Sequence, residues 1–350
     1  MKNLIFTLGV SALLLFTLGC SDNDNPVNPG DTPPDNTATS TWIEAGEYWQ
    51  STINASDYDE YACFSFATRD TVTDAATGNW DIGFRREVVK LNGGSSAVNG
   101  GDALGTSLGS EDFGLVSIDD TTGVSWTPDV IDHFIDEWYD YNPVTHELTA
   151  NQNVYSMVDA GGANYLKFRV DSIVGAGMPP DMGTVHITYF YQNTADSRDL
   201  SGAVTQAAIT VGSGTGYFDF SSGAQVNPID PENSLDWDIG FNSYELFQNS
   251  GPNGDGSCAA FLAYSELTDP TDIEAFTAQP SGAPMFPDIP GSAMTDWYDY
   301  NGQTHQLTSK GEVYLIKTGD AVYKVRIESY YTSIMGTPAS GYYTFIWSEL

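Results

Sequence analysis

The sequence is poor in basic residues, and its only long apolar run lies at the very start. Lys and Arg together number 12 against 47 Asp and Glu, which gives a formal net charge of −35 at pH 7. This acidity excludes a protein that binds nucleic acid or an anionic membrane surface through its charge. Hydrophobic residues nevertheless make up 41% of the chain and aromatic residues 13%. The acidity therefore belongs to a chain that can fold, and not to a disordered acidic tail.

The first nineteen residues have the pattern of a targeting segment. Lys2 precedes the apolar run Leu4–Leu18, which is too short and too weakly flanked for a spanning helix. Gly19 stands directly before Cys20, as a lipoprotein signal peptidase requires. We therefore expect residues 1–19 to be a lipoprotein signal peptide and Cys20 to be lipidated. The alternative is an ordinary secretory signal in which the cysteine has no role.

The segment that follows is expected to be a tether. Residues 20–41 are rich in Pro, Asp and Asn, and Val27 is their one large apolar residue. Such a composition predicts an extended, solvated segment that buries no core. Ser21, next to Cys20, is not the Asp that retains lipoproteins in the inner membrane of enteric bacteria. We therefore expect a lipid-anchored protein of the outer membrane or cell surface of a Gram-negative bacterium.

The rest of the chain is an internal duplication. Three blocks recur in the same order at offsets of 157, 159 and 157 residues, which chance does not explain. The matching blocks are Trp80–Phe84 with Trp237–Phe241, Trp138–Tyr155 with Trp297–Tyr314, and Lys167–Ser172 with Lys324–Ser329. A period of this length indicates a duplicated domain, because solenoid repeats are several-fold shorter. We place domain 1 at residues 42–196 and domain 2 at residues 197–350.

Both copies are predicted to be all-β. Residues 167–171 and 323–328 alternate charged and apolar side chains, which is typical of half-buried strands whose charged faces are solvated. Residues 154–158 and 313–316 are short β-branched or aromatic runs followed by turn residues, which predicts a hairpin in each copy. No stretch sustains a helical period. The expected architecture is a pair of tandem β-sandwiches or open barrels.

Cys63 and Cys258 are the cysteines that remain after lipidation. They fall at non-equivalent places in the two copies, so a disulfide shared by both domains is excluded. A bridge between the copies is the alternative to two buried free thiols, and the thiols are favoured.

The order of the blocks resembles the HmuY-like family of bacterial surface lipoproteins. In each copy a Trp-Asp-Ile-Gly-Phe strand and a glycine-rich segment precede Trp-Tyr-x-Tyr-Asn-x-x-x-His, then Val-Tyr, a hairpin and Lys-x-Arg. The resemblance covers nearly all of both copies. It implies an all-β fold and a non-enzymatic protein, and its best-known members capture haem through paired His or Met side chains on loops. Many relatives have no established ligand.

Several side chains are candidates for haem ligation. Haem iron takes axial ligands from His or Met, beside an apolar slot and a partner for the propionates. His146 and His305 occupy the same repeat position, where a framework role is favoured over ligation. His133 lies in a loop that differs between the copies and is the stronger candidate. The pattern around His186 predicts a half-buried strand residue. The methionine candidates are Met178, Met182, Met285 and Met294.

The basic cluster is confined to the first copy. Arg85, Arg86 and Lys90 follow the first Trp-Asp-Ile-Gly-Phe block, and the second copy has Asn242, Ser243 and Phe247 in their place. They are the candidate propionate contacts, unless they only balance charge on an acidic surface. The aromatic residues of the two Trp-Tyr-x-Tyr blocks are more often core than a sugar-binding platform.

No catalytic or resident metal site is predicted. Residues 253–257 place oxygen ligands near glycines but lack the spaced acids and the closing Glu of a calcium loop. No Ser-His-Asp or Cys-His arrangement recurs in both copies. The sequence therefore favours a haem-capturing surface protein that is not an enzyme. The alternatives are a structural or adhesive module that binds protein or glycan without haem, and a calcium-stabilised extracellular module.

Overall fold

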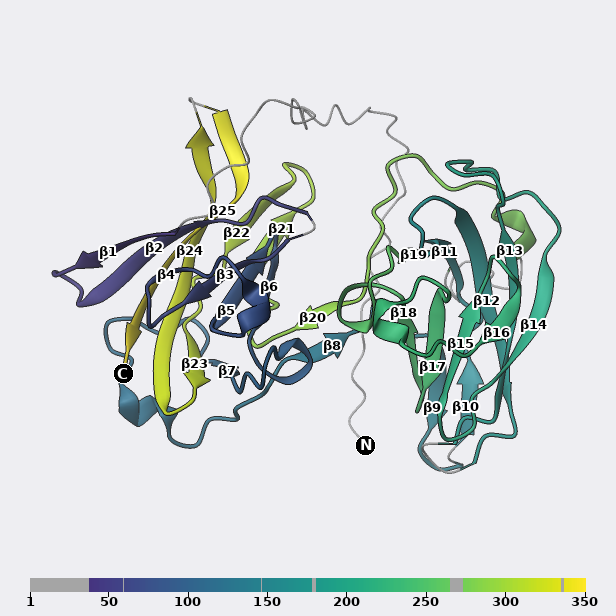
Figure 1. The fold of residues 1–350 in the computed structure, drawn as a ribbon, viewed down its shortest axis with the longest axis horizontal. Coiled ribbons are helices and arrows are strands. Elements are labelled where there is room, and N and C mark those ends of the chain that lie inside the picture. Colours follow the sequence, from purple (N-terminus) through teal and green to yellow (C-terminus); the bar gives the residue numbers. More distant parts are fainter. Residues whose placement is uncertain (1–37, 59, 146, 178–180, 265–272, 335–336) are drawn as a thin grey trace, which may run out of the picture. The chain divides into compact units, whose positions relative to one another are not determined.

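The computed structural model describes residues 38–350 apart from 59, 146, 178–180, 265–272 and 335–336. Within these residues the chain is all-β, with short 3-10 helices and no α-helix, as the sequence predicts (Figure 1). None of the sheets closes into a barrel, so the sandwich form of the prediction is the one observed. The expected signal peptide, the lipidated Cys20 and most of the tether lie outside the described residues.

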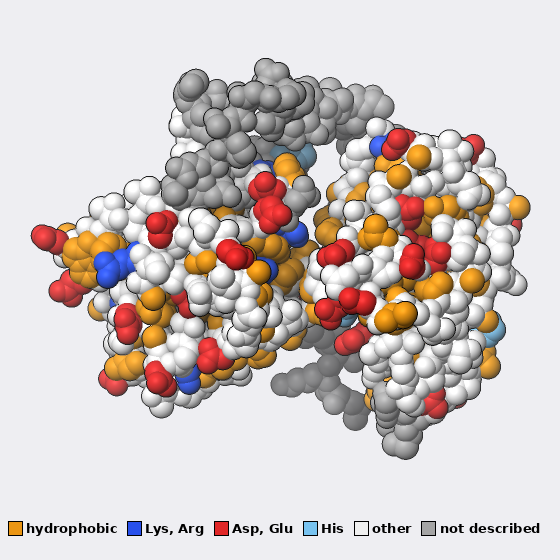
Figure 2. Space-filling model, in the orientation of Figure 1, with side chains coloured by type: hydrophobic (Ala, Val, Ile, Leu, Met, Phe, Trp, Pro, Cys, Tyr) orange, Lys and Arg blue, Asp and Glu red, His pale blue; other side chains and the backbone are white. Residues whose placement is uncertain are grey.

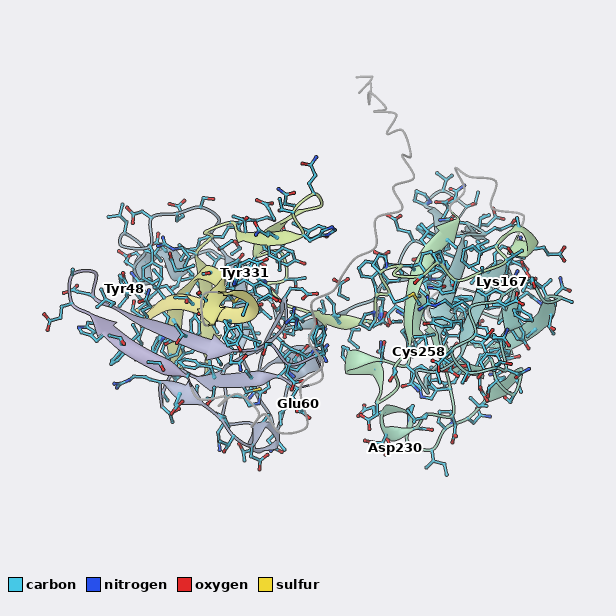
Figure 3. All side chains as sticks on the ribbon, turned by 90° about the horizontal axis from the view of Figure 1, so that it is seen from above. Tyr48, Glu60, Lys167, Asp230, Cys258 and Tyr331 are labelled. Atoms are coloured by element: carbon cyan, nitrogen blue, oxygen red, sulfur yellow. The ribbon has the colours of Figure 1, made fainter. Side chains whose placement is uncertain are left out.

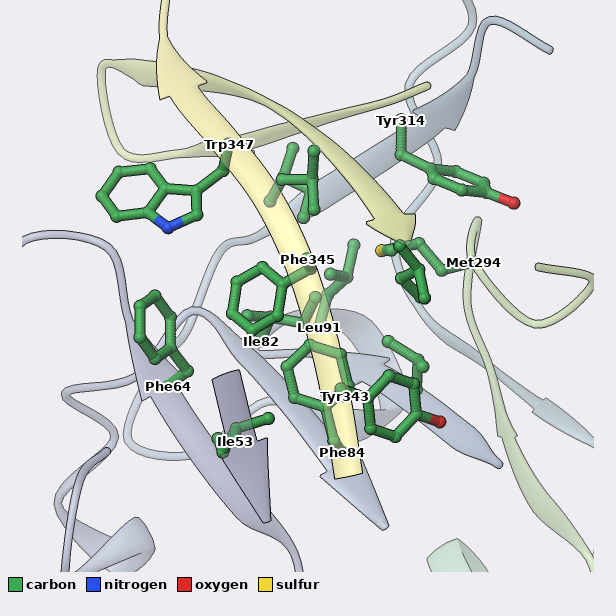
Figure 4. Close-up of a cluster of buried hydrophobic side chains, with 14 of the residues drawn as sticks. Ile53, Phe64, Ile82, Phe84, Leu91, Met294, Tyr314, Tyr343, Phe345 and Trp347 are labelled. Carbon is green, nitrogen blue, oxygen red and sulfur yellow. The ribbon is translucent and has the colours of Figure 1, made fainter. Parts of the chain in front are cut away.

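Four sheets form the bulk of the fold, and none of them is built in simple chain order. The first has the order β1(Thr39–Ile43), β2(Tyr48–Asn54), β25(Thr337–Glu349), β24(Ala321–Ile334), β23(Tyr314–Thr318) and β7(Leu104–Ser107). The sheet that packs against it has the order β4(Asp70–Thr71), β3(Ala62–Ser65), β5(Ile82–Arg85) and β6(Val88–Leu91). The buried side chains of one core come from both sheets (Figure 4).

The other two large sheets form a second sandwich. One has the order β14(Thr205–Thr210), β13(Thr184–Tyr191), β12(Tyr165–Val174), β11(Val154–Val158) and β19(Ala259–Tyr264). The other has the order β16(Ala224–Val226), β15(Thr215–Asp219), β17(Ile239–Asn242) and β18(Glu245–Gln248). The predicted hairpins are confirmed, because β11 pairs antiparallel with β12 and β23 with β24.

Three two-stranded ribbons complete the part of the fold that the structure describes. They are β9(Tyr139–Asn142) with β10(Glu147–Ala150), β21(Tyr298–Asn301) with β22(Gln306–Ser309), and β8(Val130–Asp132) with β20(Ile289–Gly291). The 3-10 helices are η1(Ala75–Thr77), η2(Gly94–Ser96), η3(Ile118–Thr121), η4(Pro231–Asn233), η5(Gly251–Asn253) and η7(Ile273–Ala275).

Each sandwich combines strands from both copies of the repeat. One core draws its buried residues from positions 53–103 and 294–347, and we call this the split lobe. The other draws them from positions 135–260 without interruption, and we call it the continuous lobe. The chain passes from one lobe to the other at β8 and returns at β20, and these two strands pair with each other. The copies have thus exchanged their second halves.

The tryptophan of each Trp-Tyr-x-Tyr block forms a hydrogen bond to the other copy, as the exchange requires. Trp138 Nε1 donates to the backbone oxygen of Tyr244 at 3.1 Å, and Trp297 Nε1 donates to that of Glu87 at 2.9 Å. Each tryptophan is buried and reaches the turn of the opposite copy. The boundary expected between residues 196 and 197 lies between β13 and β14, which pair with each other inside the continuous lobe. The position of residue 196 as the end of the first duplicated sequence unit stays a prediction.

A further apolar layer covers the outer face of the sheet that contains β24. Residues Phe113 and Val116, in the segment after β7, pack there with Val313, Leu315 and Ile346. Lys324 lies on this face and donates from Nζ to the backbone oxygens of Phe113 and Val116, both at 2.8 Å. The equivalent Lys167 is fully buried and donates to the backbone oxygen of Phe276 at 2.7 Å (Figure 3).

These lysines correct one expectation from the sequence. The alternation around Lys167 and Lys324 correctly predicts strands, but the lysine faces are not solvated, because a loop covers each of them. Arg169 and Arg326, two residues further along, pair with Asp171 and Glu328 on the same strand. The local pattern could not reveal a covering loop that comes from elsewhere in the chain.

Cys63 and Cys258 are both free and buried, as the favoured expectation holds. Burial raises the pKa of the Cys63 thiol to about 11, and it raises the pKa of the Cys258 thiol well above its ordinary value. Neither thiol is poised to react, since the thiolate is the reactive form.

Candidate functional site

The hairpin formed by β21 and β22 presents His305 at its turn. Asn301 shapes this turn, because its side-chain oxygen accepts hydrogen bonds from the backbone N–H groups of Gln303 and Thr304, and its backbone oxygen accepts one from His305. His305 has a φ of 55°, which an L-residue adopts only when the surrounding turn imposes it. The histidine is thus exposed at the tip of a well-defined ribbon.

Tyr300 orients the His305 ring. The Tyr300 Oη atom and His305 Nδ1 are 2.6 Å apart, and the tyrosine itself is 57% exposed. In the tautomer with the proton on Nδ1, that nitrogen donates to Oη and Nε2 carries the free lone pair. Histidines that ligate metals are commonly held in this way through the second ring nitrogen. No hydrogen bond to Nε2 occurs among the residues that the structure describes.

Aromatic side chains of β24 support this hairpin at its base. Leu307 N donates to Tyr331 Oη at 2.8 Å, and Tyr331 stacks edge-on with Tyr330. Trp297 contacts Tyr298 and Tyr330 directly below. The expectation that the aromatic residues of this block are core is therefore confirmed for Trp297 and wrong for Tyr300, which is exposed next to His305.

The first copy has the same hairpin in β9 and β10, with the same register. Tyr141, the counterpart of Tyr300, is 46% exposed. Two other candidate ligands of this copy lie outside the described residues. They are His146, between β9 and β10, and Met178, between β12 and β13.

His133 is bound to a carboxylate instead of presented to solvent. Its Nδ1 lies 3.0 Å from Asp288 Oδ2, its Nε2 lies 4.0 Å from Glu245 Oε2, and its ring packs near Phe247. Asp288 is completely buried. These contacts fit a residue that fastens the crossover between the two lobes better than they fit a haem ligand. His186 is half-buried in β13, in agreement with its sequence pattern.

The described methionine candidates are also engaged within the protein. Met182 and Met294 are completely buried, Met294 inside the core of the split lobe (Figure 4). The Met182 sulfur accepts a hydrogen bond from Tyr244 N at 3.0 Å, and the Met285 sulfur accepts one from Gln279 Nε2 at 3.2 Å. Of the candidate ligands that the structure describes, His305 is the one that fits an exposed iron site.

The predicted basic cluster separates into two parts. Arg86 lies in the β5–β6 turn and donates to the Ser56 backbone oxygen and to Ser340 Oγ. Arg85 and Lys90 lie on the outer face of the same two strands and contact the ring of Tyr61 instead. Arg86 is therefore part of the framework, and the other two line a separate pocket. Figure 2 shows how few basic side chains interrupt the acidic and polar surface of the face in view.

A pair of buried carboxylates escaped the sequence analysis. Asp129 and Asp288 stand 159 residues apart, each after a proline and directly before β8 or β20. Each carboxylate accepts a backbone hydrogen bond from the edge strand of a four-stranded sheet in the same copy. Asp129 accepts it from Leu91 N in β6, and Asp288 accepts it from Gln248 N in β18. The duplicated Pro-Asp dipeptide, at the same offset as the Trp-Tyr-x-Tyr block, is the signal that could have revealed them.

Protonation of His133 is expected to stabilise the fold as the pH falls. Burial lowers the His133 pKa, but the hydrogen bond and negative charge of Asp288, with Glu245 and Asp132, raise it more, so the net shift is upward. A raised pKa contributes stability that is complete below the unfolded value of about 6.5 and is lost as the pH rises through the folded value. Urea unfolding of the wild type and of His133→Gln at pH 6 and pH 8 measures the difference. We expect a smaller change with pH in the variant, and equal changes would refute the link.

The described residues contain no cluster of three or more His, Cys, Asp or Glu side chains that could hold a metal ion. Nor does any helix in the described part of the chain have the length and apolar character needed to span a membrane.

Part of the chain is similar to a known family. Residues 214–347 match the family described as HmuY protein. The matched region includes the β21–β22 hairpin with Tyr300 and His305, and it runs from the continuous lobe into the split lobe. No curated protein matches the chain.

Proposed function

We propose that this chain is a lipid-anchored surface protein that captures haem without catalysis, with His305 as an axial ligand of the iron. The observation that carries the proposal is the exposed His305 ring held through Nδ1 by Tyr300 at 2.6 Å. Haem iron binds a neutral imidazole nitrogen, and the tautomer in which Nδ1 donates to Tyr300 leaves Nε2 available for the iron. The family match over residues 214–347 supports the same function, because it contains this hairpin.

The location is part of the proposal. Cys20 would carry the lipid, and the part of the expected tether that precedes β1(Thr39–Ile43) would hold the folded lobes away from the membrane. Haem would then be met at the outer surface, where a free haem molecule is available for capture. Fractionation of cells that express the Cys20→Ala variant tests this, because the variant should leave the membrane fraction, and retention there would contradict the anchor.

Haemin titration tests the function itself. We expect the chain from residue 21 to develop a Soret band that saturates at about one haemin per chain when haemin is added at micromolar concentration. Serum albumin serves as the positive control for haemin binding, and a protein-free blank serves as the negative control. A spectrum that equals the sum of free haemin and protein would reject haem capture.

A second candidate is glycan binding, which one aromatic groove favours. Trp42 and Trp49 face each other across β1 and β2, and Trp49 stacks against Trp347. The groove they line has a volume of about 290 Å³, with Arg69 lying 4.4 Å from the Trp49 ring centroid. Trp42 is 43% exposed and Trp49 is half-buried, and tryptophan faces beside a charged side chain suit a sugar ring. Tryptophan fluorescence that no oligosaccharide changes, in wild type or Trp42→Ala, would exclude this candidate.

A further inference from the structure

The two equivalent buried carboxylates, Asp129 and Asp288, have very different surroundings. Asp288 accepts hydrogen bonds from Phe134 N, Gln248 N and Asn253 Nδ2 at 2.8 to 2.9 Å. Both of its oxygens are therefore satisfied. Asp129 is 2% exposed and accepts one backbone hydrogen bond, from Leu91 N to Oδ2, whereas its Oδ1 has no partner among the described residues. A buried oxygen left without a partner costs free energy, so its retention needs an explanation.

Two further unpartnered groups lie at the same place. Tyr61 Oη and Ser96 Oγ are buried and form no hydrogen bond of good geometry in the described part of the chain, although Ser96 lies close enough to Asp129 to lower the pKa of that carboxyl, which burial raises. Both residues line a pocket of about 250 Å³, together with Arg85, Lys90 and Pro290. Asp129 adjoins this pocket, because Ser95 N donates to its backbone oxygen and its charge acts on Tyr61 and Lys90.

Two cations flank the pocket without an acidic partner. The Arg85 guanidinium lies 4.6 Å from the Tyr61 ring centroid, and the Lys90 ammonium lies 4.0 Å from the same centroid. Neither side chain forms an ion pair within the described residues. The Asp129 carboxylate acts on Lys90 through its charge without forming an ion pair, so both cations keep donors available to an external anion.

The second copy shows that the framework does not require these groups. Asn242 and Phe247 replace Arg85 and Lys90. Phe247 packs edge-on against Tyr217 and Trp237, which gives this face an aromatic cluster in place of the cations. The charged and hydroxyl groups of the pocket therefore come from the first copy, whereas Gly251, Pro252 and Pro290 of the second copy complete its wall.

We propose that this pocket binds a small zwitterion of the size and kind of a free amino acid. The ligand carboxylate meets Arg85, Lys90 and the Tyr61 hydroxyl, while its ammonium group donates to Asp129 Oδ1 and Ser96 Oγ. Each unpartnered group then has a partner of the right polarity. A volume of about 250 Å³ lies below the ~300–1,000 Å³ of pockets for drug-sized ligands. It suits an amino acid and is too small for a haem macrocycle, so this site is separate from the one proposed at His305.

Calorimetric titration of the chain from residue 21 with each of the twenty amino acids tests the proposal. We expect saturable one-to-one binding of at least one of them, and at least tenfold weaker binding of acetate and inorganic phosphate. Lys90→Met and Asp129→Asn should each weaken the amino acid at least tenfold, while Lys317→Met, an exposed control on β23, should not change it. A melting curve of each variant shows that it is folded.

The outcomes separate the alternatives. Asp129→Asn should not weaken the binding of acetate, because acetate has no ammonium group and loses a neighbouring negative charge. Failure of all twenty amino acids to bind would overturn the proposal. So would phosphate or acetate binding as tightly as the best amino acid, since the pocket would then be a simple anion site. Haemin affinity is measured separately, and its loss in His305→Ala bears on the other site alone.

Discussion

Residues 133–288, expressed alone, should fold into a stable monomer. This stretch contains every buried residue of the two cores of the continuous lobe, from Ile135 to Phe276. It also contains β9 to β19, with all strands of both sheets of that lobe. A chain with its own complete core is expected to unfold cooperatively. Far-UV circular dichroism, urea unfolding and sedimentation velocity measure fold, cooperativity and mass.

The matched control is the contiguous repeat unit, residues 197–350, which has nearly the same length. It contains β14 to β19 of one lobe and β20 to β25 of the other, so the partners of both halves are absent. We expect it to recover them from a second copy and to sediment as a dimer at micromolar concentration. A monomeric, folded 197–350 beside an unfolded 133–288 would show that each repeat closes on itself and would contradict the exchange.

Lys324→Met should destabilise the whole chain by ~2–3 kcal/mol. The methionine keeps most of the buried stem, but the two backbone oxygens of Phe113 and Val116 lose their charged donor. Hydrogen bonds from charged donors contribute about 1.5–3 kcal/mol, and an acceptor left buried adds its desolvation cost. The covering segment, whose Phe113 and Val116 pack against Leu315 of the sheet, should loosen first. Hydrogen exchange of residues 108–126 would show this directly.

Lys317→Met is the control for this change. Lys317 is exposed on β23, the strand that pairs with β24, so its replacement should alter the free energy of unfolding by no more than ~0.5 kcal/mol. Urea unfolding of the two variants and the wild type gives the comparison. Equal effects of the two substitutions would show that the buried ammonium group has no anchoring role.

The strands, hairpins and duplication could be predicted because they depend on local pattern. Period-two alternation around Lys324 and turn residues after Ile316 are properties of a few neighbouring residues. The crosswise pairing of the copies could not be predicted. Trp138 and Trp297 donate to backbone oxygens, of Tyr244 and Glu87, and every residue type supplies such an oxygen. Equivalent repeats therefore offer equivalent partners, and the sequence does not distinguish closure within a copy from exchange.

The candidate site was predicted only in part, for a similar reason. His305 was named, but its duplication with His146 favoured a framework role, and only the Tyr300 contact distinguishes an oriented, exposed ring from a buried one. His133 was preferred because its loop diverges between the copies. Its partner Asp288 lies 155 residues away, so no local pattern could show that the ring is already bound.

The most direct test of the proposed function is the haemin affinity of His305→Ala compared with that of His133→Ala. Both variants remove one imidazole, but only the first removes the ring that Tyr300 holds at the exposed hairpin. We predict that His305→Ala weakens haemin binding at least tenfold and shifts the Soret band, with partial recovery when free imidazole is added. His133→Ala should keep the wild-type spectrum. An unchanged affinity and spectrum in His305→Ala would contradict the account.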